Sequence, residues 1–225
     1  MPRELDSPLP GVRIWLADLD AEAFEVADAW LSPSEKARAA RFVFERDAKR
    51  YRTGHAVLRR LLHAHDRLPA GVEFEIGPHG KPSSGSRPFN VSDSGALLLV
   101  AIGAVGSAEL GVDLEGLRPM VDSADLAQRH FTAAECASLH AAPPEEKSRR
   151  FLSGWTRKEA CLKAVGLGLG VETSSVDVGL DAVERKVAIP SDSGMTRVFV
   201  RSIDAGDGVL AALAWVAASR HGSLE

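Results

Sequence analysis

The chain has few cysteines and no long apolar run, and both scarcities exclude classes of protein. Cys136 and Cys161 are the only cysteines among 225 residues and lack metal-type spacing, which argues against a disulfide scaffold and fits a reducing compartment. No uncharged stretch reaches the length of a membrane span, and the N-terminus lacks the apolar core of a signal peptide. We therefore expect a cytoplasmic protein with no membrane partner.

The chain also lacks an excess of positive charge. Its 27 Lys and Arg against 31 Asp and Glu give a net charge of −4, so nothing in the overall charge indicates a nucleic acid partner. A content of 45% hydrophobic and 26% charged residues is ordinary globular usage. It is enough to bury one substantial core or two small ones.

Several common catalytic motifs are missing. Gly80-Lys81-Pro82 superficially resembles a phosphate-binding loop, but Glu75 stands where the first glycine belongs and Pro82 replaces Ser or Thr. There is no Gly-x-Ser-x-Gly elbow, and the histidines lack metal-ligand spacing. These absences argue against a P-loop enzyme, a serine hydrolase and a zinc enzyme.

The elements that the sequence predicts form two similar series. In each series a capping box, Ser32 to Glu35 or Thr132 to Glu135, starts a short helix, and a long helix over about 47–66 or 145–165 follows. Alternating residues predict strands over 12–16 and 72–76, and apolar runs predict strands over 96–102 and 110–114. Further candidate strands, with Gly and Asp between them, are 176–180, 185–189, 197–203 and 209–216. We take 96–102 and 110–114 as neighbouring strands. The pattern predicts an α+β fold of two related halves, 1–106 and 107–225, in one chain.

The segment Gly111-Val112-Asp113-Leu114-Glu115 holds a candidate metal site. Asp113 and Glu115 lie two residues apart in a predicted strand and so share one face, while Val112 and Leu114 face the core. Two carboxylates held this close repel each other, and a divalent cation relieves that repulsion. The alternative is a solvated strand face, which a lone Asp-x-Glu pair usually indicates.

Two helical stripes carry further candidates. Trp155, Glu159 and Lys163 share one side of the second long helix, where the acid and the base flank a groove or simply form a solvent-exposed pair. Arg50 lies one turn before Gly54 on the first long helix. It suits a phosphate, or extends to solvent from a helix end.

Together these motifs resemble the surfactin-synthetase-activating (Sfp) type of 4′-phosphopantetheinyl transferase. Its signature is Gly-x-Asp-x-Glu followed by Trp-x-x-Lys-Glu-Ala/Ser-x-x-Lys. The matching residues are Gly111, Asp113, Glu115, Trp155, Lys158, Glu159, Ala160 and Lys163. Upstream segments also match in the right order: Ser32-Pro33 through Arg41-Phe42, Asp47 to Arg50, Gly80-Lys81-Pro82 and Phe89 to Ser92.

The resemblance implies two pseudo-symmetric halves in a monomer, each with a long helix packed on a small antiparallel sheet, and a cofactor cleft between them. It implies transfer of phosphopantetheine from coenzyme A to a serine of an apo acyl or peptidyl carrier protein, with Mg²⁺, releasing adenosine 3′,5′-bisphosphate. The implied metal ligands are Asp113, Glu115 and Glu159, and the implied catalytic residues are Glu159 and Lys163. Coenzyme A would contact Arg38, Arg50, Lys81, Ser92, Asp93, Lys158 and Lys163.

One position departs from the family pattern. The family usually has Ser-His-Ser where this chain has Ser92-Asp93-Ser94, and that histidine is expected near a phosphate of coenzyme A. Asp93 either faces the nucleotide's 3′-phosphate or caps its own turn. The alternative function is therefore a coenzyme A- or carrier-binding protein that has lost catalysis, although Asp113, Glu115, Glu159 and Lys163 are all present.

Overall fold

The computed structural model describes residues 2–21, 27–77, 79–85, 87–167, 171–181, 183–191 and 194–216. The first half contains β1 (Arg3–Leu5), β2 (Arg13–Asp18), α1 (Ala27–Trp30), α2 (Pro33–Ala39), α3 (Glu45–Asp66), β3 (Glu75–Ile76), β4 (Pro82–Ser83), β5 (Phe89–Ser94) and β6 (Leu97–Ile102). The second half contains β7 (Leu110–Gly116), α4 (Ser123–His130), α5 (Ala133–Ala141), α6 (Pro144–Val165), a 3-10 helix (Thr173–Ser175), β8 (Arg185–Ser191), β9 (Gly194–Ile203) and β10 (Val209–Val216).

The two halves build their sheets in the same way. Two four-stranded antiparallel sheets have the orders β1-β2-β6-β5 and β7-β10-β9-β8. In each half the strand before the helices, β2 or β7, pairs with the last strand, β6 or β10. That last strand then pairs with the one preceding it, β5 or β9. The predicted α+β fold with two similar halves is confirmed.

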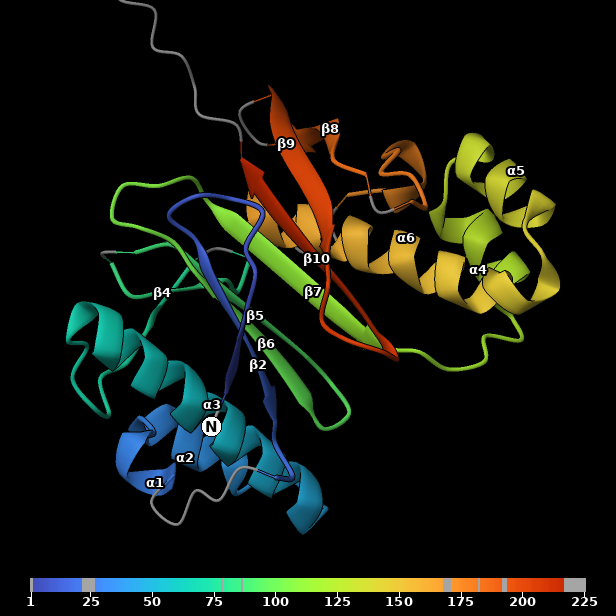
Figure 1. The fold of residues 1–225 in the computed structure, drawn as a ribbon. Coiled ribbons are helices and arrows are strands. Elements are labelled where there is room, and N and C mark those ends of the chain that lie inside the picture. Colours follow the sequence, from blue (N-terminus) through green and yellow to red (C-terminus); the bar gives the residue numbers. More distant parts are fainter. Residues whose placement is uncertain are drawn as a thin grey trace, which may run out of the picture.

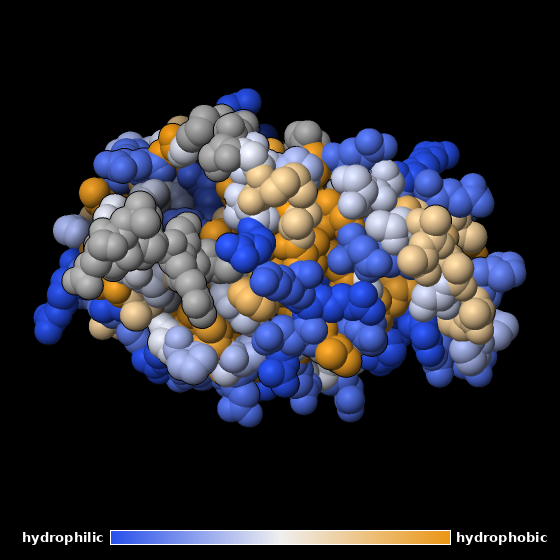
Figure 2. All heavy atoms as spheres, turned by 90° about the horizontal axis from the view of Figure 1, so that it is seen from above, coloured by the Kyte–Doolittle hydropathy of each residue, from blue (hydrophilic) through white to orange (hydrophobic). Residues whose placement is uncertain are grey.

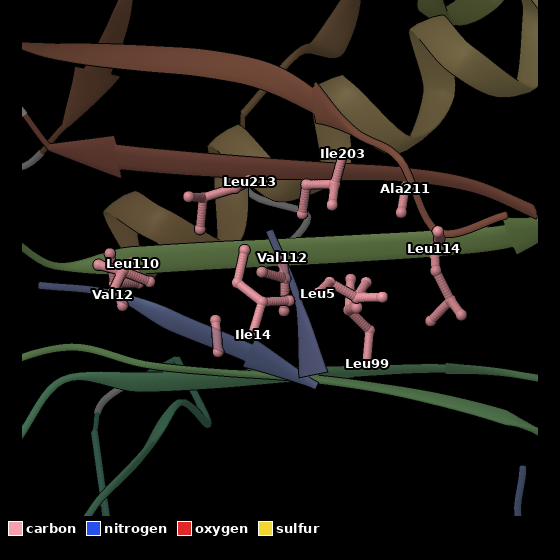
Figure 3. Packing of buried hydrophobic residues seen from close by; sticks show 12 residues of the cluster. Leu5, Val12, Ile14, Leu99, Leu110, Val112, Leu114, Ile203, Ala211 and Leu213 are labelled. Atoms are coloured by element: carbon pink, nitrogen blue, oxygen red, sulfur yellow. The ribbon is translucent and has the colours of Figure 1, made fainter. Parts of the chain in front are cut away.

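The halves stack as four layers, helix, sheet, sheet and helix (Figure 1). Alternate residues of β6 and β10 supply two cores each, as expected for strands covered on both faces. Leu99 of β6 and Leu213 of β10 pack between the sheets (Figure 3), whereas Leu98 packs toward α3 and Ala212 toward α6. The core between the sheets thus belongs to both halves.

The same buried ion pair recurs in both halves. Both capping boxes form, and each glutamate also pairs with the following long helix: Glu35 with Arg59 of α3 at 2.7 Å, Glu135 with Lys158 of α6 at 2.8 Å. Both helices have 22 residues, and both basic residues lie 14 positions after the first, from 45 to 59 and from 144 to 158. This match supports the predicted duplication at the level of single side chains.

Some predicted strands are wrong. Of the predicted strand 72–76, only Glu75–Ile76 forms a strand. The segment 176–180 does not form a strand, because its backbone groups bond to side chains. The Val176 and Val178 carbonyls accept from Lys158 and Arg157, and the Val178 amide donates to Glu135. The strands β6 and β7 lie in different sheets and are not paired. Strand β5, which the sequence did not indicate, lies beside β7.

Among the described residues, no helix is long and apolar enough to cross a membrane. Hydrophilic and hydrophobic residues are interspersed over the face shown in Figure 2.

Candidate active site

The strand β7 directs its two carboxylates toward α6. Val112 and Leu114 are buried between the sheets, so Asp113 and Glu115 face the opposite side of the strand, as predicted. Asp113 is only 6% exposed although it is charged. A carboxylate this buried needs close partners.

Gly111 allows α6 to approach this side of β7. A Cβ atom at Gly111 would lie 2.0 Å from the Ala160 carbonyl oxygen and 2.3 Å from the Ala164 amide nitrogen. No larger residue fits between strand and helix. The glycine of the Gly-x-Asp-x-Glu motif therefore brings Glu159 and Lys163 of α6 to the carboxylates of β7.

Lys163 is the closest cation to the buried carboxylate. Its Nζ lies 2.7 Å from Asp113 Oδ1 and 2.9 Å from Ser92 Oγ, and Ser92 Oγ donates to the same Asp113 oxygen at 2.7 Å. Ser92 comes from the first half, while Asp113 and Lys163 come from the second. The structure thus brings together three of the predicted site residues, contributed by both halves.

Alternate residues of β5 connect the first half to β7 by hydrogen bonds. Asn90 Oδ1 accepts from the Val112 amide at 2.9 Å, Ser92 bonds Asp113, and Ser94 Oγ donates to Glu115 Oε2 at 2.7 Å. Sequence reasoning missed Asn90 and Ser94. Their signal was the polar residues at 90, 92 and 94, which a strand places on one face.

Burial and mutual repulsion raise the pKa values of two carboxylates. Burial raises the pKa of Asp113 despite the opposing effect of Lys163 and Ser92. Burial, followed by the nearby charge of Asp113, raises the pKa of Glu159. Glu115, whose Oε2 lies 2.8 Å from Arg118 Nη1, adds to both shifts. We call Asp113, Glu115, Glu159 and Lys163 the acidic cluster.

The acidic cluster suits a hard cation by its chemistry. As the side chains lie, no group of three or more His, Cys, Asp or Glu residues in the described ranges is arranged to hold a metal ion. The available oxygens are nevertheless carboxylates that repel one another, and one more positive charge would lower their pKa values. Oxygen ligands of this kind fit Mg²⁺.

Lys158, predicted to contact coenzyme A, lies elsewhere. It is 1% exposed, and its ammonium bonds Thr173 O, Val176 O and the Glu135 carboxylate. Burial lowers its pKa, and Glu135 opposes that shift. These contacts give Lys158 a structural role, so we leave it out of the site proposed below.

Three other predicted residues line one pocket of about 600 Å³ between α3 and β5. Arg38, Arg50 and Asp93 all face it, with Arg46, Tyr51 and His55 beside them. We call it the arginine pocket. Asp93 is exposed, and its carboxylate has no hydrogen bond or ion pair with any residue of the described ranges. The structure thus gives no sign of the turn-capping role.

Lys81 lies outside the arginine pocket. Its Nζ donates to Glu109 Oε2 at 2.7 Å and to the Leu110 carbonyl at 3.0 Å, and it lies 3.5 Å from the carbonyl of Ala164 at the end of α6. Lys81 therefore connects the first half to the second as the side chain lies here.

The fold and the acidic cluster suit an enzyme that acts on phosphates, because carboxylates beside a lysine favour metal-assisted reactions of phosphates. Comparison with known proteins is more specific. Residues 109–206 match the 4′-phosphopantetheinyl transferase superfamily, and residues 18–104 match its family "4′-phosphopantetheinyl transferase, N-terminal".

Whole relatives agree with these matches. The 4′-phosphopantetheinyl transferase HetI of a Nostoc species is 36% identical over 182 residues, which is 77% of this chain and 76% of HetI. A 4′-phosphopantetheinyl transferase of Bacillus subtilis is 31% identical over 183 residues, 80% of this chain and 79% of the relative. The transferase Sfp of Bacillus subtilis strain 168 is 26% identical over 84% of each chain. The chain belongs to the 4′-phosphopantetheinyl transferase superfamily and is a transferase.

Proposed function

We propose that this protein transfers the phosphopantetheine group of coenzyme A to a serine of an apo acyl or peptidyl carrier protein, releasing adenosine 3′,5′-bisphosphate. Family membership supports the reaction class. The observation that carries the proposal for this chain is the acidic cluster, where both halves meet Asp113 through Ser92 and Lys163.

Asp113, Glu115 and Glu159 are the residues that would hold Mg²⁺. When bound, the ion would neutralise charge on the pyrophosphate and on the leaving phosphate. Lys163 is 30% exposed at its side chain and already neutralises Asp113, so its ammonium is close enough to offset further negative charge there.

Glu159 is the candidate base. Burial raises its pKa, and a carboxylate with a raised pKa accepts a proton more readily. The serine oxygen forms a bond to the β-phosphorus of coenzyme A, and the bond from that phosphorus to the oxygen of the leaving bisphosphate breaks. The serine proton passes to Glu159, directly or through a water.

The arginine pocket is the candidate site for the nucleotide end of coenzyme A. Arg38 and Arg50 bring guanidinium groups to the pocket, and Asp93 faces it from β5. The guanidinium of Arg50 is paired with Asp20 as the side chains lie. Guanidinium groups suit phosphate oxygens. Ser92, on the opposite face of β5, and Lys81, near the start of β7, remain candidate cofactor contacts.

The reaction is tested by incubating the protein with coenzyme A, Mg²⁺ and an apo carrier protein, then measuring the mass of the carrier. We expect the carrier to gain one phosphopantetheine, and only when all three components are present. A carrier of unchanged mass beside intact coenzyme A would indicate the alternative, a binding protein without catalysis. Coenzyme A cleaved without a carrier would indicate a hydrolase.

We also propose a cytoplasmic location. Cys136 and Cys161 are free thiols, and Cys161 is fully buried. Unpaired cysteines are typical of reducing compartments.

A further inference from the structure

Side chains of β5 connect the first half to the edge of β7. The two strands lie in different sheets but beside each other. Asn90 Oδ1 accepts from the Val112 amide, and this bond sets which residues of the two strands meet. Ser92 and Ser94 follow on the same face of β5, so their hydroxyls reach the carboxylates of β7. The contact between the halves is therefore polar where the acidic cluster begins.

The carboxylate of Asp113 has all its donors on one oxygen. Ser92 Oγ donates to Oδ1 at 2.7 Å, and Lys163 Nζ lies 2.7 Å from the same oxygen. The second oxygen, Oδ2, accepts no hydrogen bond from any residue in the described ranges. Because Asp113 is largely withdrawn from water, an anionic oxygen without a donor is costly there. A bound cation would remove that cost.

Glu115 is bonded in the same way. Ser94 Oγ donates to Oε2 at 2.7 Å, and Arg118 Nη1 lies 2.8 Å from that oxygen, whereas Oε1 has no donor in the described part of the chain. Glu159 accepts no hydrogen bond there at either oxygen. The three carboxylates thus keep one oxygen of Asp113, one of Glu115 and both of Glu159 without a donor. Oxygens of this kind are ligands for a hard divalent cation.

The serines act on these carboxylates without adding charge. A donor that holds one carboxylate oxygen restricts rotation of the group and so fixes where the other oxygen lies. Hydrogen bonds behind metal-binding carboxylates contribute roughly 10- to 100-fold to metal affinity. Because a hydroxyl is neutral, its removal leaves the charge of the cluster unchanged. A loss of metal affinity on removal of a serine hydroxyl therefore reports the orientation of the carboxylate.

We propose that Ser92 and Ser94 are positioning residues for the divalent cation of the reaction, because each holds one oxygen of a β7 carboxylate and leaves the other for the cation. The cation rests on the proposed function, whereas the hydrogen bonds rest on the structure alone. Both serines belong to the first half, and Asp113, Glu115 and Glu159 belong to the second. The metal affinity of the second half thus depends on its contact with the first.

The test is titration of the full chain with Mn²⁺, which also prefers carboxylate ligands, followed by the electron paramagnetic resonance signal of the free ion. Coenzyme A is left out, so a direct contact of Ser92 with the cofactor cannot contribute. We expect Ser92→Ala and Ser94→Ala each to weaken Mn²⁺ binding about tenfold, and Ser94→Thr, which keeps the hydroxyl, to bind like the wild type. The matched control is Ser34→Ala, because Ser34 Oγ donates to Glu73 Oε2 at 2.6 Å outside the acidic cluster. It should leave the affinity unchanged.

Alanine variants that bind Mn²⁺ as tightly as the wild type, or a wild type that does not bind it, would overturn the proposal. Equal losses in Ser94→Ala and Ser94→Thr would do the same, since the hydroxyl would not be the cause. If circular dichroism shows that Ser92→Ala is unfolded, the two variants of half-buried Ser94 decide.

The transfer assay separates this proposal from the proposed function. A wild type that transfers no phosphopantetheine, with alanine variants that lose Mn²⁺ affinity, would remove the function and keep the role of the serines. A wild type that transfers it, with alanine variants of unchanged Mn²⁺ affinity, would keep the function and remove that role.

Discussion

Two lysines of α6 have different roles because their surroundings differ. Lys158 is 1% exposed at its side chain and neutralises buried Glu135, whereas Lys163 is 30% exposed and faces Asp113 and Ser92. They are five residues apart, which places them on different sides of a helix. The signature contains both, but only Lys163 lies in the acidic cluster.

The carboxylates of the cluster should be required for transfer. Asp113→Asn and Glu159→Gln are each expected to lower kcat by at least about 100-fold, because they remove a proposed ligand and a proposed base. Carrier mass measures the activity, and circular dichroism checks the fold. The control Glu184→Gln, at an exposed carboxylate before β8, should remain active. Substantial activity in either cluster variant would remove that residue from the proposed site.

Asp93→His should improve binding of coenzyme A. The unpaired carboxylate faces the arginine pocket, so replacing it with a donor removes repulsion of a 3′-phosphate. We expect the KM for coenzyme A to fall about tenfold, and the KM for dephospho-coenzyme A to change much less. Asp93→Asn, which removes only the charge, should give an intermediate effect. Equal shifts for both cofactors, or lost stability without gained affinity, would favour a turn-capping role instead.

At the scale of elements, each capping box also anchors its short helix to the next long helix. Glu35 bonds Arg59 and Glu135 bonds Lys158, and both cations lie over aromatic rings, Phe74 in the first half and Phe131 in the second. A buried ion pair of this kind depends on both charges, because removal of one leaves the other unpaired in the core.

The ionisation of Glu35 predicts how acid weakens the fold. Its pKa is about 2 in the folded protein against 4.5 as the ordinary value, so its contribution is complete above about pH 4.5. As the pH falls from there to about 2, roughly 3 kcal/mol of the free energy of unfolding should be lost. The carboxyl ¹³C shift of Glu35 measures the folded pKa directly. A midpoint near 4.5 would contradict the described network.

Gly111 should be essential for the packing of β7 against α6. Gly111→Ala would place its Cβ against helix backbone, which cannot rotate away, and should lower the free energy of unfolding by about 3 kcal/mol or more. The matched control is Gly116→Ala on the same strand, where a Cβ would meet no atom within 4 Å and should cost little. Urea unfolding of both variants makes the comparison. Similar stabilities would show that helix and strand can separate without cost.

The sequence predicted the helices better than the strands. Two capping boxes located the starts of α2 and α5, and the long amphipathic patterns located α3 and α6 to within about two residues, whereas α1 and α4 were not predicted. The strand β5 was missed because its polar residues serve contacts with the other half, which no local pattern encodes. The segment 176–180 was taken for a strand because its apolar residues alternate, although its backbone serves Lys158, Arg157 and Glu135.

The sequence predicted the local geometry of the site but not its tertiary contacts. The spacing of Asp113 and Glu115 fixed their common face, and the stripe of Glu159 and Lys163 fixed theirs. That the two faces meet depends on the contact at Gly111, which is tertiary. The buried role of Lys158 depends on Glu135, which lies 23 positions earlier in the chain.

At the scale of the whole molecule, the two halves share the core between their sheets. Leu5, Ile14 and Leu99 of the first half pack with Val112 and Leu213 of the second. Because these residues of both halves share one core, the boundary that we propose between 106 and 107 divides a repeated pattern rather than two independent units.

We therefore expect one cooperative unfolding transition and a monomer in solution, because both halves of the site lie in one chain. Calorimetry measures the first, with equal calorimetric and van't Hoff enthalpies. Light scattering measures the second. Two separate transitions would contradict the shared core, and a stable trimer would mean that a neighbouring chain completes the site.

The pleat of β5 has a consequence for how such a protein can change over evolutionary time. Ser92 and Ser94 are constrained by the carboxylates they bond, whereas Asp93 between them has no such partner within the described ranges. A substitution at 93 therefore alters the arginine pocket without changing a bond to the acidic cluster. Under the proposed function, cofactor preference and chemical competence sit on opposite sides of a single strand. Cofactor preference can then change by substitution at 93 while selection keeps the reacting residues constant.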